Sequence, residues 1–309
     1  MRTLLAVSLT ALLLAPMGAL AESGTIWVDA RGQQDAGTFG GLTLSMGNGT
    51  VDASTSSDYN ELPNIVEVYT ATWCMNCVTS EHTMKNAVEG IDAVLIHYHR
   101  VWYEIEDPFG SDSTEERWEG VYGDASKEAI GSKRAAPTSV IDGQRMHTGS
   151  TAKGISLLDD YSQSLQVGNR AWFMDGTIDF SVSFSDSVAS FSWNFDNLVS
   201  SCADDCPTQT TTPWVLFVED SARFEDGSNN LEEYIHVNHA AVQLSGFNGT
   251  ETIDVPSAWD GEDMNAVLLI DWEVEQDQGR DIFGNLPGIG VASLFSLLAA
   301  APLVRSRQH

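Results

Sequence analysis

Strand-like and helix-like patterns alternate along the first half of the chain. Residues 65–69 and 93–98 are short β-prone runs, and a helical pattern lies between them. A third strand pattern at residues 139–141 is followed by a helical pattern at residues 153–165. Because strands that alternate with helices build layered α/β structures, we expect an α/β domain over residues 61–165.

The second half carries a different pattern, in which apolar and polar residues alternate. Ile178, Phe180 and Val182 are separated by single polar residues, and turn-rich segments divide several runs of this kind. Period-two alternation with intervening turns is typical of antiparallel sheets, so we expect a β-sandwich over residues 167–275. The predicted fold class is therefore an α/β domain followed by an all-β sandwich-like domain.

The N-terminal 60 residues contain two segments of different composition. Residues 1–21 hold an early arginine and a leucine-rich run, and they end on Ala-Leu-Ala. This order is typical of a secretory signal peptide that is removed before Glu22. Residues 22–60 are rich in Gly, Ser, Thr and Asp, so we expect an N-terminal extension with loop and linker structure.

The C-terminal residues 286–309 combine a Pro-Gly step, an apolar run over residues 291–304 and two trailing arginines. This order resembles the sorting signals of archaeal surface proteins of the Pro-Gly-Phe type, with Ile289 in place of Phe. The resemblance implies a tail that is cut off and replaced by a lipid. A retained membrane helix and a buried terminal helix are the alternatives, and spanning helices usually need about 20 apolar residues. The tail predicts tethering to a membrane.

Charge limits the classes of partner. The chain has 44 Asp and Glu residues against 15 Lys and Arg residues, a formal net charge of -29. Such a surface repels phosphate backbones, so nucleic-acid binding is excluded as a function. Solubility in salty water explains the acidity without any basic partner.

The four cysteines form two close pairs, which fits an exported chain in an oxidising compartment. Cys74-Met75-Asn76-Cys77 follows a β-prone run and opens a helix. Unpaired N–H groups at a helix start favour the thiolate of Cys74, and Cys77, one turn later, is placed to attack a mixed disulfide. Cys202 and Cys206 lie between two strand patterns among acidic residues, and we expect a structural loop disulfide there.

Motifs around the first cysteine pair resemble the thioredoxin superfamily. The residues that carry the resemblance are Trp73-Cys74-Met75-Asn76-Cys77 and, downstream, Ala135-Ala136-Pro137-Thr138 before a strand and Asp142-Gly143. A group of secreted thioredoxin-like proteins is also similar at Glu67-Val68-Tyr69-Thr70, His97-Tyr98-His99 and Asp107-Pro108-Phe109. The resemblance implies a thioredoxin-like fold over residues 61–165. It also implies a cis Pro137 against Cys74, substrate contacts from Trp73, Ala136 and Thr138, and a buried acid behind the cysteines.

Glu67 is the candidate for that acid, as a proton shuttle for Cys77. It lies one position further from the first cysteine than the family's acid does. Because strand side chains alternate between faces, this offset turns Glu67 to the opposite face unless a bulge corrects it. A carboxylate satisfied by other partners is the alternative.

Taken together, the residues predict a thiol–disulfide oxidoreductase that is anchored outside the cytoplasmic membrane and acts on exported protein thiols or a membrane redox partner. It needs no metal and no cofactor beyond its redox-active disulfide. A surface binding or adhesion protein with a structural Cys74–Cys77 bridge is one alternative. Metal handling is another, through Cu(I) on the soft sulfur ligands or through zinc with help from His97 and His99.

Overall fold

The computed structural model describes residues 36–47, 51–103, 107–168, 173–185, 188–201, 208–261 and 263–274. The predicted signal peptide, the C-terminal tail and the Cys202/Cys206 pair lie outside these ranges. Residues 1–275 group into one compact unit and residues 276–309 into another, and the description below concerns the first.

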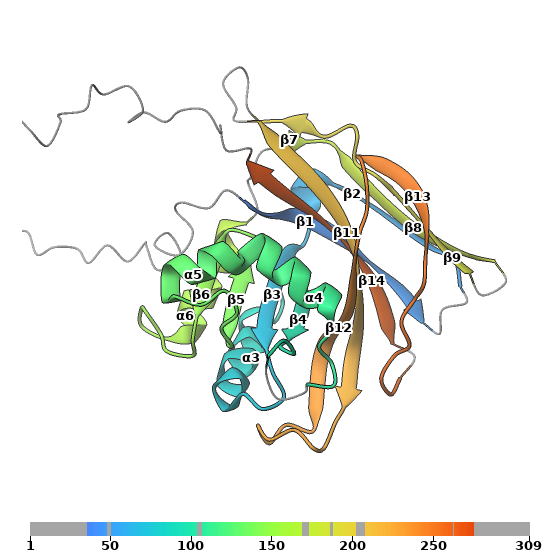
Figure 1. Cartoon of the computed structure of the whole chain (residues 1–309). Helices are drawn as coiled ribbons and strands as arrows, with labels where there is room; N and C mark the ends of the chain where they lie inside the picture. Colours follow the sequence, from blue (N-terminus) through green and yellow to red (C-terminus); the bar gives the residue numbers. More distant parts are fainter. Residues whose placement is uncertain are drawn as a thin grey trace, which may run out of the picture. The chain divides into compact units, whose positions relative to one another are not determined.

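One mixed sheet of eight strands runs through this unit (Figure 1). In spatial order its strands are β1 (Ala36–Gly47), β14 (Met264–Val274), β11 (Gln209–Arg223), β12 (Glu233–Gln243), β4 (Ala93–His99), β3 (Asn64–Thr70), β5 (Thr138–Ile141) and β6 (Arg145–Thr148). Strand β4 is parallel to both β3 and β12, and the other neighbours are antiparallel. The sheet therefore joins strands from both halves of the sequence.

The predicted fold class is wrong. Instead of an α/β thioredoxin-like domain followed by a separate sandwich, the described residues are mostly β-strand in large sheets, with few helices. The two halves meet where Val237 of β12 pairs with His97 of β4. The physical reason is that β4 would otherwise present an unpaired edge, and β12 covers it. Alternation shows which face of a strand is buried, but it does not show which strand lies beside it.

Two strands also replace the expected N-terminal loop. β1 pairs along its length with β14, and β2 (Ala53–Asp58) pairs with β8 (Thr177–Ser185). The small residues of β1 permit close approach: a Cβ added at Gly41 would collide with the backbone of Leu268 in β14. Glycine here therefore marks tight packing of one strand on another, not a flexible linker.

A second sheet has four strands in the order β13 (Asn248–Ile253), β9 (Val188–Asn194), β8 and β2. Its apolar face packs on β1, β11 and β14, and Phe180, Phe191, Phe217 and Leu268 are buried between the two sheets. The alternation of Ile178, Phe180 and Val182 indeed marks a strand with one buried face. A short pair, β7 (Phe173–Asp175) and β10 (Val199–Ser200), forms a separate two-stranded sheet.

Helices cover both faces of the β3–β4 region. Helices α3 (Met75–Ala87) and α6 (Leu157–Val167) pack on the face that carries Val66 and Val68. Helix α4 (Asp112–Trp118), the π-helical turn η2 (Glu119–Gly123) and α5 (Asp124–Ile130) pack on the face that carries Ile65 and Tyr69 (Figure 1). A short 3-10 turn, η1 (Tyr59–Glu61), precedes β3. This arrangement places the start of α3, with both cysteines, next to the C-terminal end of β3, which is an interior strand of the sheet.

Candidate functional site

Cys74 and Cys77 form a disulfide at the start of α3, with 5.3 Å between their Cα atoms. Cys74 is the N-cap of the helix, and its Sγ accepts a hydrogen bond from the N–H of Cys77 at 3.2 Å. Cys74 is 6% exposed and Cys77 is fully buried. The outer sulfur is therefore the one that a partner can reach, and the inner sulfur is shielded.

The segment before β5 contacts the cysteines, as expected from the sequence. Ala136 and Trp73 pack against the cluster of Ala71, Cys74 and Cys77. The Ala136–Pro137 peptide bond is cis, which confirms that expectation. The side chain of Thr138 is buried and donates to the Ala135 carbonyl at 2.6 Å, so its hydroxyl shapes this turn.

Glu67 does not lie beside the cysteines. The pairing of β3 with β4 runs without a register shift, so no bulge corrects the offset, and the Glu67 side chain lies on the face opposite α3. There it forms a fully buried ion pair with Arg117 and accepts hydrogen bonds from Tyr98, at 2.6 Å, and from Tyr122. The structure therefore places the Glu67 carboxylate away from Cys77, with its hydrogen-bonding capacity met by Arg117, Tyr98 and Tyr122, and gives no support to a proton shuttle at this residue.

Arg117 also pairs with Asp271 of β14 at 2.8 Å, which ties α4, β3 and β14 together. Burial raises the pKa of Asp271 to about 6, with Arg117 opposing and Glu67 adding to the rise. Burial alone would lower the pKa of Arg117, but the charges of Asp271 and Glu67 hold it well above its usual value. This cluster is an internal ion pair that holds elements together.

A different acid, Glu81, lies on the face of the cysteines. It is one turn after Cys77 on the buried side of α3, and it accepts a hydrogen bond from the hydroxyl of Thr70 at the end of β3. Burial raises the pKa of Glu81, although Thr70 and the charge of His99 pull it down. The sequence could have indicated Glu81, because it lies four positions after Cys77 and residues at this spacing share one helix face.

Asp107 fixes the loop ahead of the cysteines. Its carboxylate accepts the N–H of Thr72 at 2.7 Å and the N–H of Phe109 at 3.1 Å, and it contacts Nδ1 of His99 at 3.1 Å. Burial by itself raises the pKa of Asp107, but the charge and hydrogen bond of His99 and the two N–H groups lower it below its usual range. The acid of the Asp-Pro-Phe motif is thus an anchor for this loop.

The tip of the β11–β12 hairpin contacts the same loop from the other side. The backbone N–H of Asn229 donates to the Thr72 carbonyl at 3.1 Å, and its side-chain Nδ2 donates to the Ala71 carbonyl at 3.4 Å. Asn230 Nδ2 lies 3.5 Å from Sδ of Met75. The β-rich half of the chain therefore contributes to the cysteine site, which the sequence did not indicate.

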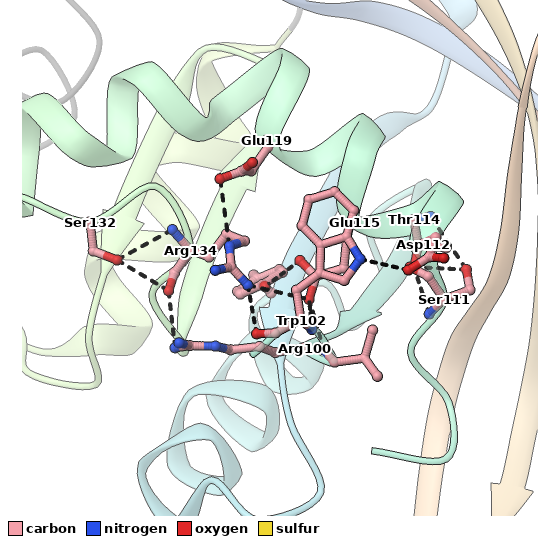
Figure 2. A network of polar contacts seen from close by, with 11 residues as sticks. Arg100, Trp102, Ser111, Asp112, Thr114, Glu115, Glu119, Ser132 and Arg134 are labelled. Carbon is pink, nitrogen blue, oxygen red and sulfur yellow. Dashed lines mark hydrogen bonds and ion pairs between the residues drawn. The ribbon is translucent and has the colours of Figure 1, made fainter. Parts of the chain in front are cut away.

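A polar network joins the loop after β4 to the segment that leads to Ala136 (Figure 2). Arg134 donates to the Trp102 carbonyl at 2.9 Å and lies 3.5 Å from Glu119, while Arg100 donates to the Arg134 carbonyl at 3.0 Å. The guanidinium of Arg100 also stands 5.9 Å from the ring centroid of Trp73. The network thereby supports the aromatic residue that flanks Cys74.

Glu115 of α4 anchors this network to the sheet. One of its carboxylate oxygens accepts the N–H groups of Val101 and Trp102 at 2.7 and 3.0 Å, and the other accepts the hydroxyl of Tyr69 at 2.6 Å. The loop beside the cysteines is therefore tied to α4 and β3, so its geometry is set by buried structure.

Among the described residues, no group of three or more His, Cys, Asp or Glu side chains is arranged to hold a metal ion. His97 is buried, and burial lowers its pKa well below the usual value; its ring stacks on His236 at 6.2 Å between centroids. In the described ranges, no helix has both the length and the apolar character needed to cross a bilayer.

Comparisons with known proteins give little. No protein-family model and no curated protein matches the chain. A structural-genomics protein of Agrobacterium tumefaciens is similar over 62% of this chain and 77% of its own, with 15% identity and a TM-score of 0.39. HBP35 of Porphyromonas gingivalis is similar over 68% of this chain and 63% of its own, with 16% identity and a TM-score of 0.36. At these scores neither similarity carries an argument.

Proposed function

We propose that this chain is a thiol–disulfide oxidoreductase that acts on exported protein thiols outside the cytoplasmic membrane. The observation that carries the proposal is the placement of the two cysteines at the start of α3, with Cys74 as the helix N-cap and 6% exposed and Cys77 fully buried. A bridge at a helix start is easily opened to a stabilised thiolate, because the helix N–H groups and dipole favour the negative charge.

The exchange balances as two displacements. In the reduced protein, the Cys74 thiolate attacks a substrate disulfide, forms a mixed disulfide and releases one substrate sulfur as a thiolate. Cys77 then attacks Cys74, reforms the Cys74–Cys77 bond and releases the second substrate sulfur. Two electrons pass to the substrate in this direction. In the reverse direction, a substrate thiolate attacks Cys74 and releases Cys77, and the second substrate thiolate then displaces Cys74, so a substrate dithiol is oxidised.

Glu81 supports the proton transfers that this exchange requires. Cys77 is enclosed, so its sulfur is stable in the reduced protein as a neutral thiol and must lose its proton before it attacks. Glu81 is the buried acid on the same helix face. It also lines a cavity of about 550 Å³ between α3 and the β11–β12 hairpin, which gives protons a route from solvent.

Trp73 and Ala136 complete the site as the substrate-facing surface. Both pack on the cysteine cluster, so a peptide joined to Cys74 through sulfur lies along them. Arg100 over the Trp73 ring and the Asp107 contact to Thr72 fix this surface in place. A preorganised surface of this kind lowers the entropic cost of aligning three sulfurs for in-line displacement.

The test is a pair of substitutions assayed with an insulin disulfide as substrate. Cys74→Ser is expected to abolish exchange, and Cys77→Ser is expected to leave a substrate trapped on Cys74 as a mixed disulfide. Trapping through Cys77 in a Cys74→Ser protein would reverse the roles. No exchange at all, with a reduction potential below about -300 mV, would instead indicate a structural bridge in a binding protein.

A further inference from the structure

The hairpin between β11 and β12 places the buried side chain of Asn229 against the loop that precedes Cys74. Asn229 is 2% exposed. Besides its two bonds to the Thr72 and Ala71 carbonyls, its Oδ1 accepts the hydroxyl of Tyr234 at 2.7 Å and the N–H of Leu231 at 3.0 Å. Tyr234 and Leu231 therefore fix the orientation of the amide, so that Nδ2 points at the loop.

The two carbonyls that Asn229 contacts belong to the turn that aims Cys74. The Ala71 carbonyl also accepts the N–H of Cys74 at 3.0 Å, which closes the turn before the helix. On the opposite side, the N–H of Thr72 is held by Asp107. The turn is thus hydrogen-bonded on two sides: Asn229 of the hairpin donates to its carbonyls, and Asp107 accepts the N–H of Thr72.

We propose that Asn229 is a positioning residue for Cys74, which keeps the outer sulfur aligned with the N–H groups at the start of α3. The proposal rests on the function proposed above and deepens it. In the disulfide form, the N–H of Cys77 lies 3.2 Å from the sulfur of Cys74. When the disulfide opens, the Cys74 thiolate depends on this N–H for stabilisation of its charge. A hydrogen bond to a charged atom weakens steeply as its angle departs from linearity, so a turn that tilts loses thiolate stabilisation.

Through Asn229, the β-rich half of the chain takes part in the chemistry of Cys74. Asn229 lies 158 positions from Ala71, and it projects from strands that belong to the eight-stranded sheet. The reactivity of Cys74 is therefore coupled to the position of the β11–β12 hairpin.

The experiment measures the thiolate of Cys74 directly, in the full chain carrying Cys77→Ser. Ultraviolet absorbance and the rate of iodoacetamide alkylation are followed as a function of pH. Asn229→Ala is expected to leave about three- to tenfold less thiolate at a fixed pH below the midpoint, the equivalent of one lost hydrogen bond. Tyr234→Phe keeps the ring but removes one of the two donors that hold Oδ1 of Asn229, so a smaller change in the same direction is expected.

The matched control is Asn60→Ala. Asn60 also donates its Nδ2 to a backbone carbonyl, that of Met174 at 3.2 Å, away from the cysteines. It is expected to leave the thiolate titration unchanged.

An unchanged titration in a folded Asn229→Ala protein would overturn the proposal, as would an equal change in Asn60→Ala. If Asn229→Ala does not fold, Tyr234→Phe decides: an unaltered titration in that variant overturns it. The titration needs no substrate, so a wild-type chain without exchange activity would refute the proposed function and still leave this measurement decisive.

Discussion

Two buried polar clusters lie on opposite faces of the same two strands, and they differ in how their charge is balanced. On the face of α4, Glu67 and Asp271 share the guanidinium of Arg117. On the face of α3, Glu81 accepts a hydrogen bond from the neutral Thr70 hydroxyl, with the charge of His99 nearby.

This difference distinguishes a cluster that stabilises the fold from an acid that is suited to proton transfer. A carboxylate held by a buried guanidinium cannot exchange a proton without disturbing the ion pair that links α4, β3 and β14. A buried carboxylate with a raised pKa and no Arg or Lys partner changes protonation at little structural cost, which is what a proton-transfer group requires. On this basis, the first cluster stabilises the fold and the second serves the cysteines.

The largest expected effect tests the first cluster. Arg117→Met leaves Glu67 and Asp271 buried without a cation, so we expect a loss of about 3–5 kcal/mol in the free energy of unfolding, measured by urea denaturation. The control is Arg223→Met, because Arg223 also pairs with two carboxylates but is 59% exposed. There the free energy of unfolding should fall far less than in Arg117→Met, because solvent screens exposed ion pairs. Equal losses in the two variants would mean that the buried cluster contributes no special stability.

The second prediction concerns the two acids directly. Glu81→Gln keeps the size and the bond to Thr70 but removes the exchangeable proton, so disulfide exchange should slow about tenfold or more and lose one inflection in its pH profile. Glu67→Gln should destabilise the protein and leave the shape of that profile unchanged. The roles would be reversed if Glu67→Gln altered the profile and Glu81→Gln did not. Initial rates with an insulin disulfide, measured across pH on folded protein, distinguish the outcomes.

Part of this picture could be predicted from sequence. The position of the cysteine pair between a β-prone run and a helix, and the cis bond before Pro137, followed from local pattern and resemblance. Local pattern carries this information because helix starts and turns are set by neighbouring residues. Strand periodicity also indicated that Glu67, one position further from Cys74 than the acid of thioredoxins, would point to the opposite face of β3.

The rest depends on contacts between distant residues. Nothing in the alternation of β12 indicates that it pairs with β4, because any strand with a buried face would show the same pattern. The contact of Asn229 with Ala71 is equally invisible, since a polar residue at a hairpin tip is typical of solvent-exposed turns. Glu81 was within reach, because its spacing from Cys77 places both on one helix face, but an acid in a helix is usually exposed.

The smallest expected effect tests the hydrogen bond between Thr70 and Glu81. The hydroxyl donates to the carboxylate and so favours its ionised form, which lowers the pKa of Glu81 against the effect of burial. Thr70→Val preserves the shape of the side chain and removes the donor. The pKa of Glu81 should then rise further, and the corresponding inflection in the exchange profile should move to higher pH by on the order of half a unit to one unit.

The opposite face supplies the control for this last substitution. Thr38 donates to Glu67 and Asp271 in the Arg117 cluster, so Thr38→Val removes an equivalent hydroxyl from a carboxylate that takes no part in exchange. It should lower stability slightly and leave the inflection in place. If Thr70→Val moved the inflection to lower pH, or if Thr38→Val moved it as far, Glu81 would not be the group that titrates, and the distinction between the two clusters would fail.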